Sequence, residues 1–219
     1  AVRERRRAAQ SERGGAGEEE SFFGPSSTAA LPGTYQVTLV VGDRRYTKPV
    51  IVTGDPRIEM TQAQVIAQHQ ASKAIEATQS RVTRVIGGVD DLIRQLTGVQ
   101  VTLHSTRDAN MTPALTEIEG TITNLRHFRD SVLARPLPGL GYRQYPRLRE
   151  EVQTISGMIA RPQWAITAGE TVRSGELVVE TDDAQRRLDT IVRDRVGKIN
   201  DLLKGTPHVI TPNTPRVLQ

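Results

Sequence analysis

Three absences in this 219-residue sequence exclude whole classes of protein. There is no cysteine, which excludes disulfides, thiolate catalysis, zinc–cysteine sites and iron–sulfur clusters. Aromatic residues make up only 4% of the chain, which disfavours an all-β barrel and an aromatic-lined carbohydrate or RNA groove. No run of about 18 apolar residues occurs, so the sequence predicts no transmembrane helix.

Lysine is scarce as well, although the chain is basic. Of the 29 basic residues only four are lysine, which leaves 25 arginines against a formal net charge of only +4. The arginines are spread over the whole chain and mixed with acids instead of forming one stripe. We therefore do not expect nucleic acid as the partner, and binding through a basic N-terminal arm stays the weakest of three functional hypotheses.

The common catalytic motifs are absent. The sequence has no HExxH, G-x-S-x-G, GxxxxGK[ST] or GxGxxG pattern, so it gives no support for a metalloprotease, a serine hydrolase or a nucleotide-binding loop. The histidines show no metal-ligand spacing: they are His69, His104, His127 and His208. We therefore expect no catalytic residue, no metal site and no cofactor, and we expect that the chain is not an enzyme.

The first 30 residues are expected to form a flexible arm. The chain begins with Ala1 and has no apolar segment of a signal peptide, which we interpret as processing, a fragment of a longer polypeptide or a trimmed start. Glycines and balanced charges interrupt any periodicity. The alternative hypothesis is a docking tail with an aromatic anchor and a basic triplet, which are Phe22, Phe23, Arg5, Arg6 and Arg7.

Residues 34–52 have the pattern of a β-hairpin. Apolar and polar residues alternate through the first half, which is the strand period. Gly42-Asp43, a two-residue turn with glycine first, is typical of a type II′ hairpin turn. The resulting register places Leu39 opposite Tyr46 and Tyr35 opposite Val50, so that one face is apolar.

No other segment of the sequence has a convincing strand pattern that could extend this hairpin into a larger sheet. Pro49 cannot donate to a strand ladder, which favours an edge position for the second strand. Because an isolated two-stranded hairpin is marginal in water, it must pack on helices or be completed by strands from outside this chain. Its candidate contact residues are Tyr35, Val37, Leu39, Tyr46 and Val50.

The hairpin region also resembles a known module. Residues 31–39 (LPGTYQVTL), 46–50 (YTKPV) and 55–57 (DPR) are similar to the C-terminal module of exported bacterial sortilin-like, BNR-repeat "glycosyl hydrolase-like" propeller proteins. That resemblance implies a hairpin that ends a small Ig-like sandwich, followed by a helical region, in a periplasmic or otherwise extracytoplasmic protein.

Two departures limit what the resemblance implies. This chain has Gly42-Asp43 where the family usually has Asp-Gly, and it lacks the propeller with its Ser-x-Asp-x-Gly-x-x-Trp boxes. No chemistry of the family is therefore carried over. The family's upstream strands would precede residue 1, so the resemblance implies a processed or separately encoded C-terminal piece.

Residues 58–205 have the pattern of four helices. Capping boxes open the first at Thr61 and the fourth at Thr167, while Thr112-Pro113 and Pro146 open the second and third. Apolar residues recur at helical spacing, and the expected core comprises Ile75, Val82, Val85, Val89, Leu92, Leu96, Leu115, Ile118, Ile122, Leu125, Phe128, Val132, Leu148, Val152, Ile155, Ile159, Val172, Val179, Leu188, Ile191 and Ile199. Short connections favour an antiparallel four-helix bundle.

Several details of these helices are specific expectations. The first helix should end near Leu96 with Gly98 as its C-cap, and Gly87-Gly88 should mark a kink or a close helix crossing. Asp182-Asp183 is a candidate interruption of the fourth helix, which should reach Leu203. Trp164 is read as a core residue at a turn, with an interface anchor as the alternative. Residues 206–219 should form an extended tail containing prolines.

These patterns predict a mainly α protein in four parts: a flexible arm (1–30), a hairpin or incomplete Ig-like β-module (31–57), a four-helix bundle (58–205) and a tail (206–219). The favoured function is a non-catalytic structural or interaction subunit of a larger extracytoplasmic assembly, whose partners are other protein subunits, membrane proteins among them. The alternative is an accessory C-terminal domain of an exported hydrolase-like propeller protein.

Overall fold

The computed structural model describes residues 28–106, 108–136 and 144–212, and this part of the chain is mainly helical. Its only sheet is a two-stranded antiparallel hairpin, which confirms the mainly α class with one hairpin. In chain order the described elements are β1 (Gly33–Val41), β2 (Arg44–Val52), α2 (Gln62–Thr106), the 3₁₀ turn η2 (Ala109–Met111), α3 (Thr112–Phe128), the π-helical turn η3 (Arg129–Leu133), α4 (Leu148–Ile159), α5 (Ala168–Ile191), the π-helical turn η5 (Val192–Val196) and α6 (Gly197–Leu202).

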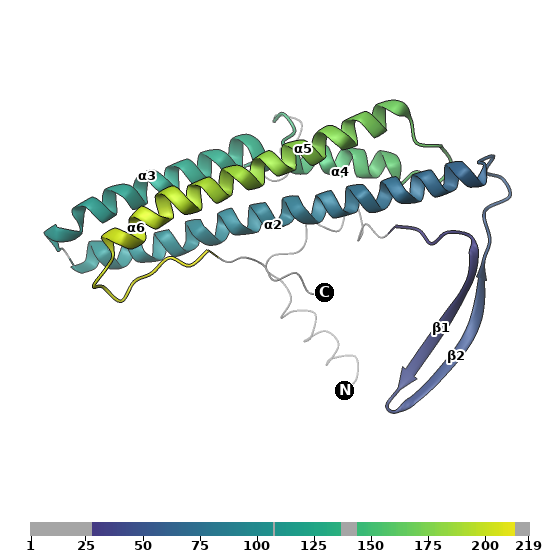
Figure 1. The fold of residues 1–219 in the computed structure, drawn as a ribbon, viewed down its shortest axis with the longest axis horizontal. Helices are drawn as coiled ribbons and strands as arrows, with labels where there is room; N and C mark the ends of the chain where they lie inside the picture. The colour runs from purple at the N-terminus through teal and green to yellow at the C-terminus, as the bar shows by residue number, and fades with distance from the viewer. Residues whose placement is uncertain (1–27, 107, 137–143, 213–219) are drawn as a thin grey trace, which may run out of the picture.

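Helix α2 is the longest described element, with 45 residues, and it runs the length of the helical part (Figure 1). Helices α3 and α4 follow one another along α2, and α5 continues through η5 into α6 to form a third rod beside both. The four expected helices are present in the described residues. Because α3 and α4 lie end to end, the helices form three rods, whereas four helices side by side were expected.

The apolar stripes of α2, α3 and α4 pack into one core, as predicted from their spacing. This core also includes Leu177, Ala184 and Leu188 of α5. The sequence assignment of Val172 and Val179 to the core is wrong, because they are 62% and 57% exposed. The same seven-residue spacing continues to Arg186 and Arg193, so the stripe that contains Val172 and Val179 becomes charged further along the helix. The buried stripe of α5 consists of apolar or small residues throughout.

Two expected helix boundaries are also wrong. Helix α2 does not end near Gly98 but continues to Thr106, because Val99 and Leu103 extend the contact with the core beyond that glycine. Asp182-Asp183 does not interrupt α5, since these carboxylates bind Arg81 and Arg186 at the surface. The last helix ends at Leu202, and the positive φ of +87° at Gly205 follows it.

The predicted capping boxes are formed at both sites. Thr61 donates its backbone N–H to Gln64 Oε1 (2.8 Å), and Gln64 donates its own to Thr61 Oγ1 (3.3 Å). The same exchange joins Thr167 and Glu170 at 2.8 and 3.2 Å. These bonds satisfy N–H groups that a helix start leaves without partners, so both helices begin where the sequence predicts.

The glycine pair of α2 lies at a close helix contact. A Cβ built at Gly88 would lie 3.2 Å from Leu188 Cδ2 of α5, whereas a Cβ at Gly87 would meet nothing within 4 Å. Gly88 therefore permits α5 to approach α2 closely, as one of the two sequence interpretations expected. The other interpretation, a kink, is not needed to explain the pair because α2 is one uninterrupted helix.

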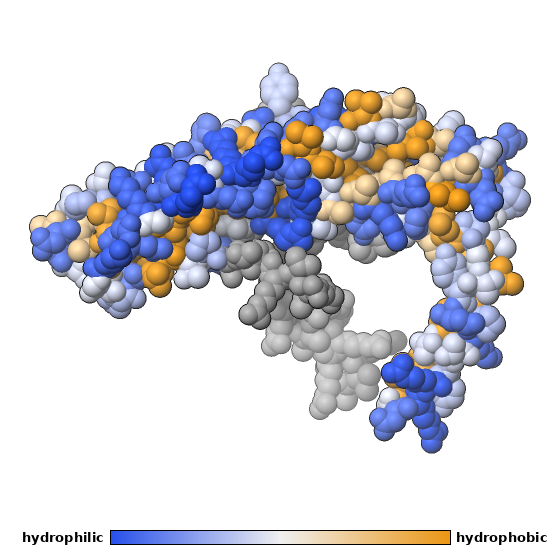
Figure 2. Space-filling model, viewed as in Figure 1, coloured by the Kyte–Doolittle hydropathy of each residue, from blue (hydrophilic) through white to orange (hydrophobic). Residues whose placement is uncertain are grey.

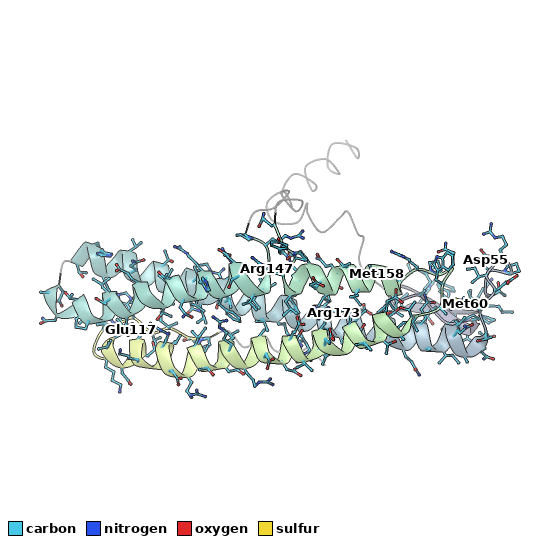
Figure 3. All side chains as sticks on the ribbon, turned by 90° about the horizontal axis from the view of Figure 1, so that it is seen from above. Asp55, Met60, Glu117, Arg147, Met158 and Arg173 are labelled. Carbon is cyan, nitrogen blue, oxygen red and sulfur yellow. The ribbon has the colours of Figure 1, made fainter. Side chains whose placement is uncertain are left out.

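Charged side chains join the three rods at their surfaces. Glu117 of α3 accepts hydrogen bonds from Lys198 (2.7 Å) and Arg195 (3.4 Å) near the end of the molecule farthest from the hairpin (Figure 3). Arg173 of α5 pairs with Glu151 of α4 and with two glutamates of its own helix. These carboxylates, first Glu180 and then Glu176, raise the pKa of Arg173 above its ordinary value, so it stays charged.

Candidate interaction surface

The hairpin has the register that the sequence predicts. Leu39 is paired with Tyr46 and Tyr35 with Val50, across two strands of nine residues each. Gly42 has a φ of +58°, the left-handed conformation that the primed hairpin turns require at their first position. Thr38 Oγ1 and Thr47 Oγ1 share a hydrogen bond of 2.8 Å across the strands.

The hairpin stands away from the helices (Figure 1). None of its residues belongs to the hydrophobic core, and Leu39 is 61% exposed. The exposed large apolar side chains of the hairpin are Tyr35, Val37, Leu39, Val40, Val41, Tyr46, Val50 and Ile51. Of the two alternatives left open by the sequence, packing against the bundle is therefore not the one this structure adopts.

The two edges of the hairpin differ in what their backbones offer. Val41 and Arg44 flank the two-residue turn and form its hydrogen-bonded closing pair, and bonded and non-bonded pairs then alternate along the register. Residues of non-bonded pairs point their N–H and C=O groups away from the partner strand. In β1 these outward residues are Thr34, Gln36, Thr38 and Val40.

The outward residues of β2 are Arg45, Thr47, Pro49 and Ile51. Pro49 has no N–H, so it interrupts the row of donors in the middle of this edge. Arg45 at the same edge adds a charge, and charges and prolines are the features by which natural proteins block open sheet edges. Strand β1 contains neither a proline nor a charged residue, so no residue of its own blocks this edge against another strand.

One face of the hairpin is more apolar than the other. Tyr35, Val37 and Leu39 share a face with Tyr46 and Val50, because directly paired residues and alternate residues of a strand point to the same side. Lys48 and Arg44 of β2 lie on this face too. The five hairpin residues expected as contact residues are thus brought together on one exposed face.

The connection from the hairpin to α2 is shaped by the Asp55-Pro56-Arg57 sequence. Arg57 donates Nη2–H to Asp55 Oδ2 (2.6 Å) and its backbone N–H to Asp55 Oδ1 (3.0 Å). These side-chain and backbone hydrogen bonds from Arg57 lower the pKa of Asp55 below its usual value. Ile58 closes the turn by donating its backbone N–H to the Asp55 carbonyl (3.1 Å), so the motif forms a hydrogen-bonded turn between β2 and α2.

Trp164 lies at the turn between α4 and α5. The side chain is 69% exposed, so the core interpretation is wrong and the interface alternative stays a prediction. Gln68 of α2 ties this turn to α2, because its Nε2 donates to the carbonyls of Ile159 (2.9 Å) and Trp164 (3.2 Å). Figure 2 shows further hydrophobic side chains on the surface over α5, where Val172 and Val179 are exposed.

The remaining expected site residues belong to the N-terminal arm. Arg5, Arg6, Arg7, Phe22 and Phe23 lie outside the described residues. Within residues 28–106, 108–136 and 144–212, no group of three or more histidine, aspartate or glutamate side chains is placed to hold a metal ion. In the same part of the chain no helix is long and apolar enough to cross a bilayer.

Sequence reasoning found the apolar face of the hairpin but missed the four outward residues of β1. The signal was present, because a two-residue turn fixes which pairs are hydrogen-bonded and hence which residues face outward. It also missed Val40 and Ile51, the exposed apolar residues of the other face. The β1 edge says more about a partner than the apolar face does, because the main-chain groups of an edge determine where and in which register another strand can pair.

Comparison with known proteins adds no identification. No protein-family model matches the chain, and neither a curated protein sequence nor a solved structure matches it significantly. The resemblance of residues 31–57 to a propeller-protein module therefore remains an expectation drawn from the sequence. The geometry of the hairpin is the basis on which a function is argued.

Proposed function

We propose that this chain is a non-catalytic interaction subunit of a larger extracytoplasmic assembly, and that it binds a partner protein by adding β1 to a partner's strand. The observation that carries the proposal is the difference between the two hairpin edges. The β1 edge offers four outward residues without a charge or a proline, whereas Pro49 and Arg45 block the β2 edge.

An open edge of this kind needs a partner for two physical reasons. Unpaired strand N–H and C=O groups form a template for another chain, and proteins without a partner normally block them. Apolar side chains on the face beside that edge would gain free energy from burial, at roughly 25 cal/mol per Å² removed from water. A partner strand beside β1 would pair the free main-chain groups of this edge. The part of the partner that carries this strand would cover the apolar face of the hairpin.

The side chains of β1 define the partner strand. On the face of Tyr35, Val37 and Leu39, the neighbouring strand should place apolar residues, since cross-strand pairs stabilise a sheet through such contacts. On the face of Gln36 and Thr38 it should place polar or β-branched residues. The partner is therefore a β-strand with period-two alternation, and its main chain supplies most of the hydrogen bonds.

The test compares two proline variants in gently solubilised extract of the source cells. Thr38→Pro removes an outward N–H from β1, and Thr47→Pro removes the equivalent N–H from β2. Both variants lose the same Thr38–Thr47 hydroxyl contact, which makes them a matched pair. The readout is the native mass of the particle that contains the chain.

We expect the wild type and Thr47→Pro to migrate in a large particle and Thr38→Pro to be released to about its own 24.1 kDa. Migration of all three as free chains would overturn the proposal. Equal release of both proline variants would show that the integrity of the hairpin, and not the β1 edge, holds the chain. If the strand paired to β1 belongs to the same polypeptide, the accessory-domain alternative replaces the subunit proposal.

A further inference from the structure

The end of the described chain is held on the helices in an unusual way. After Gly205 the chain bends at Thr206 and Pro207 and continues to residue 212 without regular secondary structure, and Ile210 is buried in the core cluster with 1% of its surface exposed. Val209, the residue before it, is 67% exposed. The segment therefore contributes a single apolar side chain to the core.

Two side-chain amides bind the backbone of consecutive residues. Asn200 of α6 donates Nδ2–H to the Ile210 carbonyl (2.9 Å) and accepts the Ile210 N–H at its Oδ1 (2.8 Å). Gln95 of α2 makes the same two-point contact with Thr211, at 2.8 and 3.0 Å. Both main-chain groups of both residues are thus satisfied by side chains of the helices.

This pattern is that of a site for an extended peptide. Successive residues of an extended chain point their N–H and C=O groups to opposite sides, and here a different helix supplies the amide for each residue. Asn200 and Gln95 act as neighbouring strands would, so the backbone is recognised without regard to its side chains. Selectivity comes from the apolar position of Ile210.

The segment leading to this site is only partly buried. Residues 204, 205, 207 and 209 are exposed, and Gly205 with its φ of +87° provides a change of direction before Pro207. Few buried contacts and exposed backbone are the features of regions that open locally at low free-energy cost. The exposed residues of this segment add little to the attachment of the tail, which therefore depends on the buried Ile210 side chain and on the amides of Asn200 and Gln95.

We propose that Asn200, Gln95 and the Ile210 position form a binding site for an extended peptide that carries a β-branched apolar residue, with residues 206–212 as an exchangeable internal ligand. The external ligand is a segment of a partner protein with this pattern. A tether gives the internal tail an effective concentration on the order of millimolar, so it competes with an external peptide until it is displaced.

The experiment uses the full chain and a fluorescein-labelled peptide with the sequence of residues 206–212 (TPHVITP), followed by fluorescence polarisation. In the variant Ile210→Asp the internal tail no longer fills the site. We expect this variant to bind the peptide at least about tenfold more tightly than the wild type, where the tail competes. A peptide with aspartate in place of the isoleucine should not bind.

Two further variants locate the binding. Asn200→Ala placed in the Ile210→Asp chain should weaken peptide binding about tenfold, whereas Gln185→Ala, which removes an amide bonded to Asp189 on α5, should not change it. Circular dichroism confirms folding, and Ile210→Ala replaces Ile210→Asp if the latter does not fold. A wild-type dimer that the labelled peptide converts to monomers would support the site and identify a second copy's tail as the ligand.

Failure of the peptide to bind a folded Ile210→Asp or Ile210→Ala chain would overturn the proposal, because the contacts would then be a fixed part of the fold. Equal binding to the wild type would place the peptide at another surface and overturn it as well. The hairpin plays no part in this test, so its result is independent of the proposed β1 partner.

Discussion

The bundle buries its apolar residues, whereas the hairpin exposes residues of the same kind to solvent. Leu96 of α2 has no exposed surface, whereas Leu39 of β1 is 61% exposed. In the bundle the stripe of each helix faces another helix of the same chain, so burial stabilises the folded chain itself. In the hairpin the same kind of side chain faces solvent, so among the described residues it adds no burial to the fold, and under the proposed function a partner buries it.

The largest expected effect tests this contrast directly with one substitution at two positions. Leu96→Ala should lower the free energy of unfolding by about 3 kcal/mol, because it leaves a cavity in a closely packed core. Leu39→Ala should change it by less than about 0.5 kcal/mol, as exposed substitutions usually do. Urea denaturation followed by circular dichroism measures both.

If Leu39→Ala destabilised the chain as much as Leu96→Ala, the hairpin would be packed in solution and the open face would not exist. The slope of the urea transition serves as a control. It should be the same for both variants, because neither changes how much surface the bundle exposes on unfolding.

The second effect concerns whether the hairpin folds as an independent unit. Gly42→Ala forces a residue with a Cβ into a φ of +58°, at a cost of about 1–2 kcal/mol that only the hairpin bears. Amide hydrogen exchange in β1 and β2 should accelerate about tenfold, while exchange in α2 stays unchanged. Gly33→Ala, at a position without a positive φ, is the matched control and should have little effect on exchange.

The sequence predicted the bundle better than the surface because a helix stripe is a local pattern. The α2 stripe from Ile75 to Leu96 is buried as expected, and both capping boxes are formed where Thr61 and Thr167 predicted them. Burial is decided by neighbours far along the chain. The period alone placed Val172 in the core, although none of the described helices buries it.

The same reason explains two further errors and one omission. A glycine at 98 is a common helix end, but tertiary contacts of Leu103 extend the helix past it. A lone tryptophan is usually buried, but the turn held by Gln68 leaves Trp164 outside. The docking of Ile210 has no sequence signal, because it depends on amides of two helices that are distant from each other in the chain.

The third effect tests how closely α2 and α5 approach each other. Gly87→Ala should stabilise the chain by up to about 1 kcal/mol, since alanine is the better helix former and its Cβ meets open space. Gly88→Ala should stabilise it less or not at all, because its Cβ would press on Leu188 at 3.2 Å. Thermal denaturation of the two variants measures the difference, and equal stabilisation would contradict the close contact.

The smallest effect separates packing from surface charge within the bundle. Arg173→Gln removes contacts with glutamates of α4 and α5 and should cost about 0.5 kcal/mol, because exposed ion pairs contribute little in water. Arg186→Gln, which breaks one pair with Asp183 on its own helix, should cost less. In about 1 M salt the loss for Arg173→Gln should shrink, because screening already weakens the pairs in the wild type. If salt did not change this loss of stability, the aliphatic part of the Arg173 side chain would be joining α4 to α5 by packing. A charged residue would then stabilise the fold through burial, as the apolar core residues do.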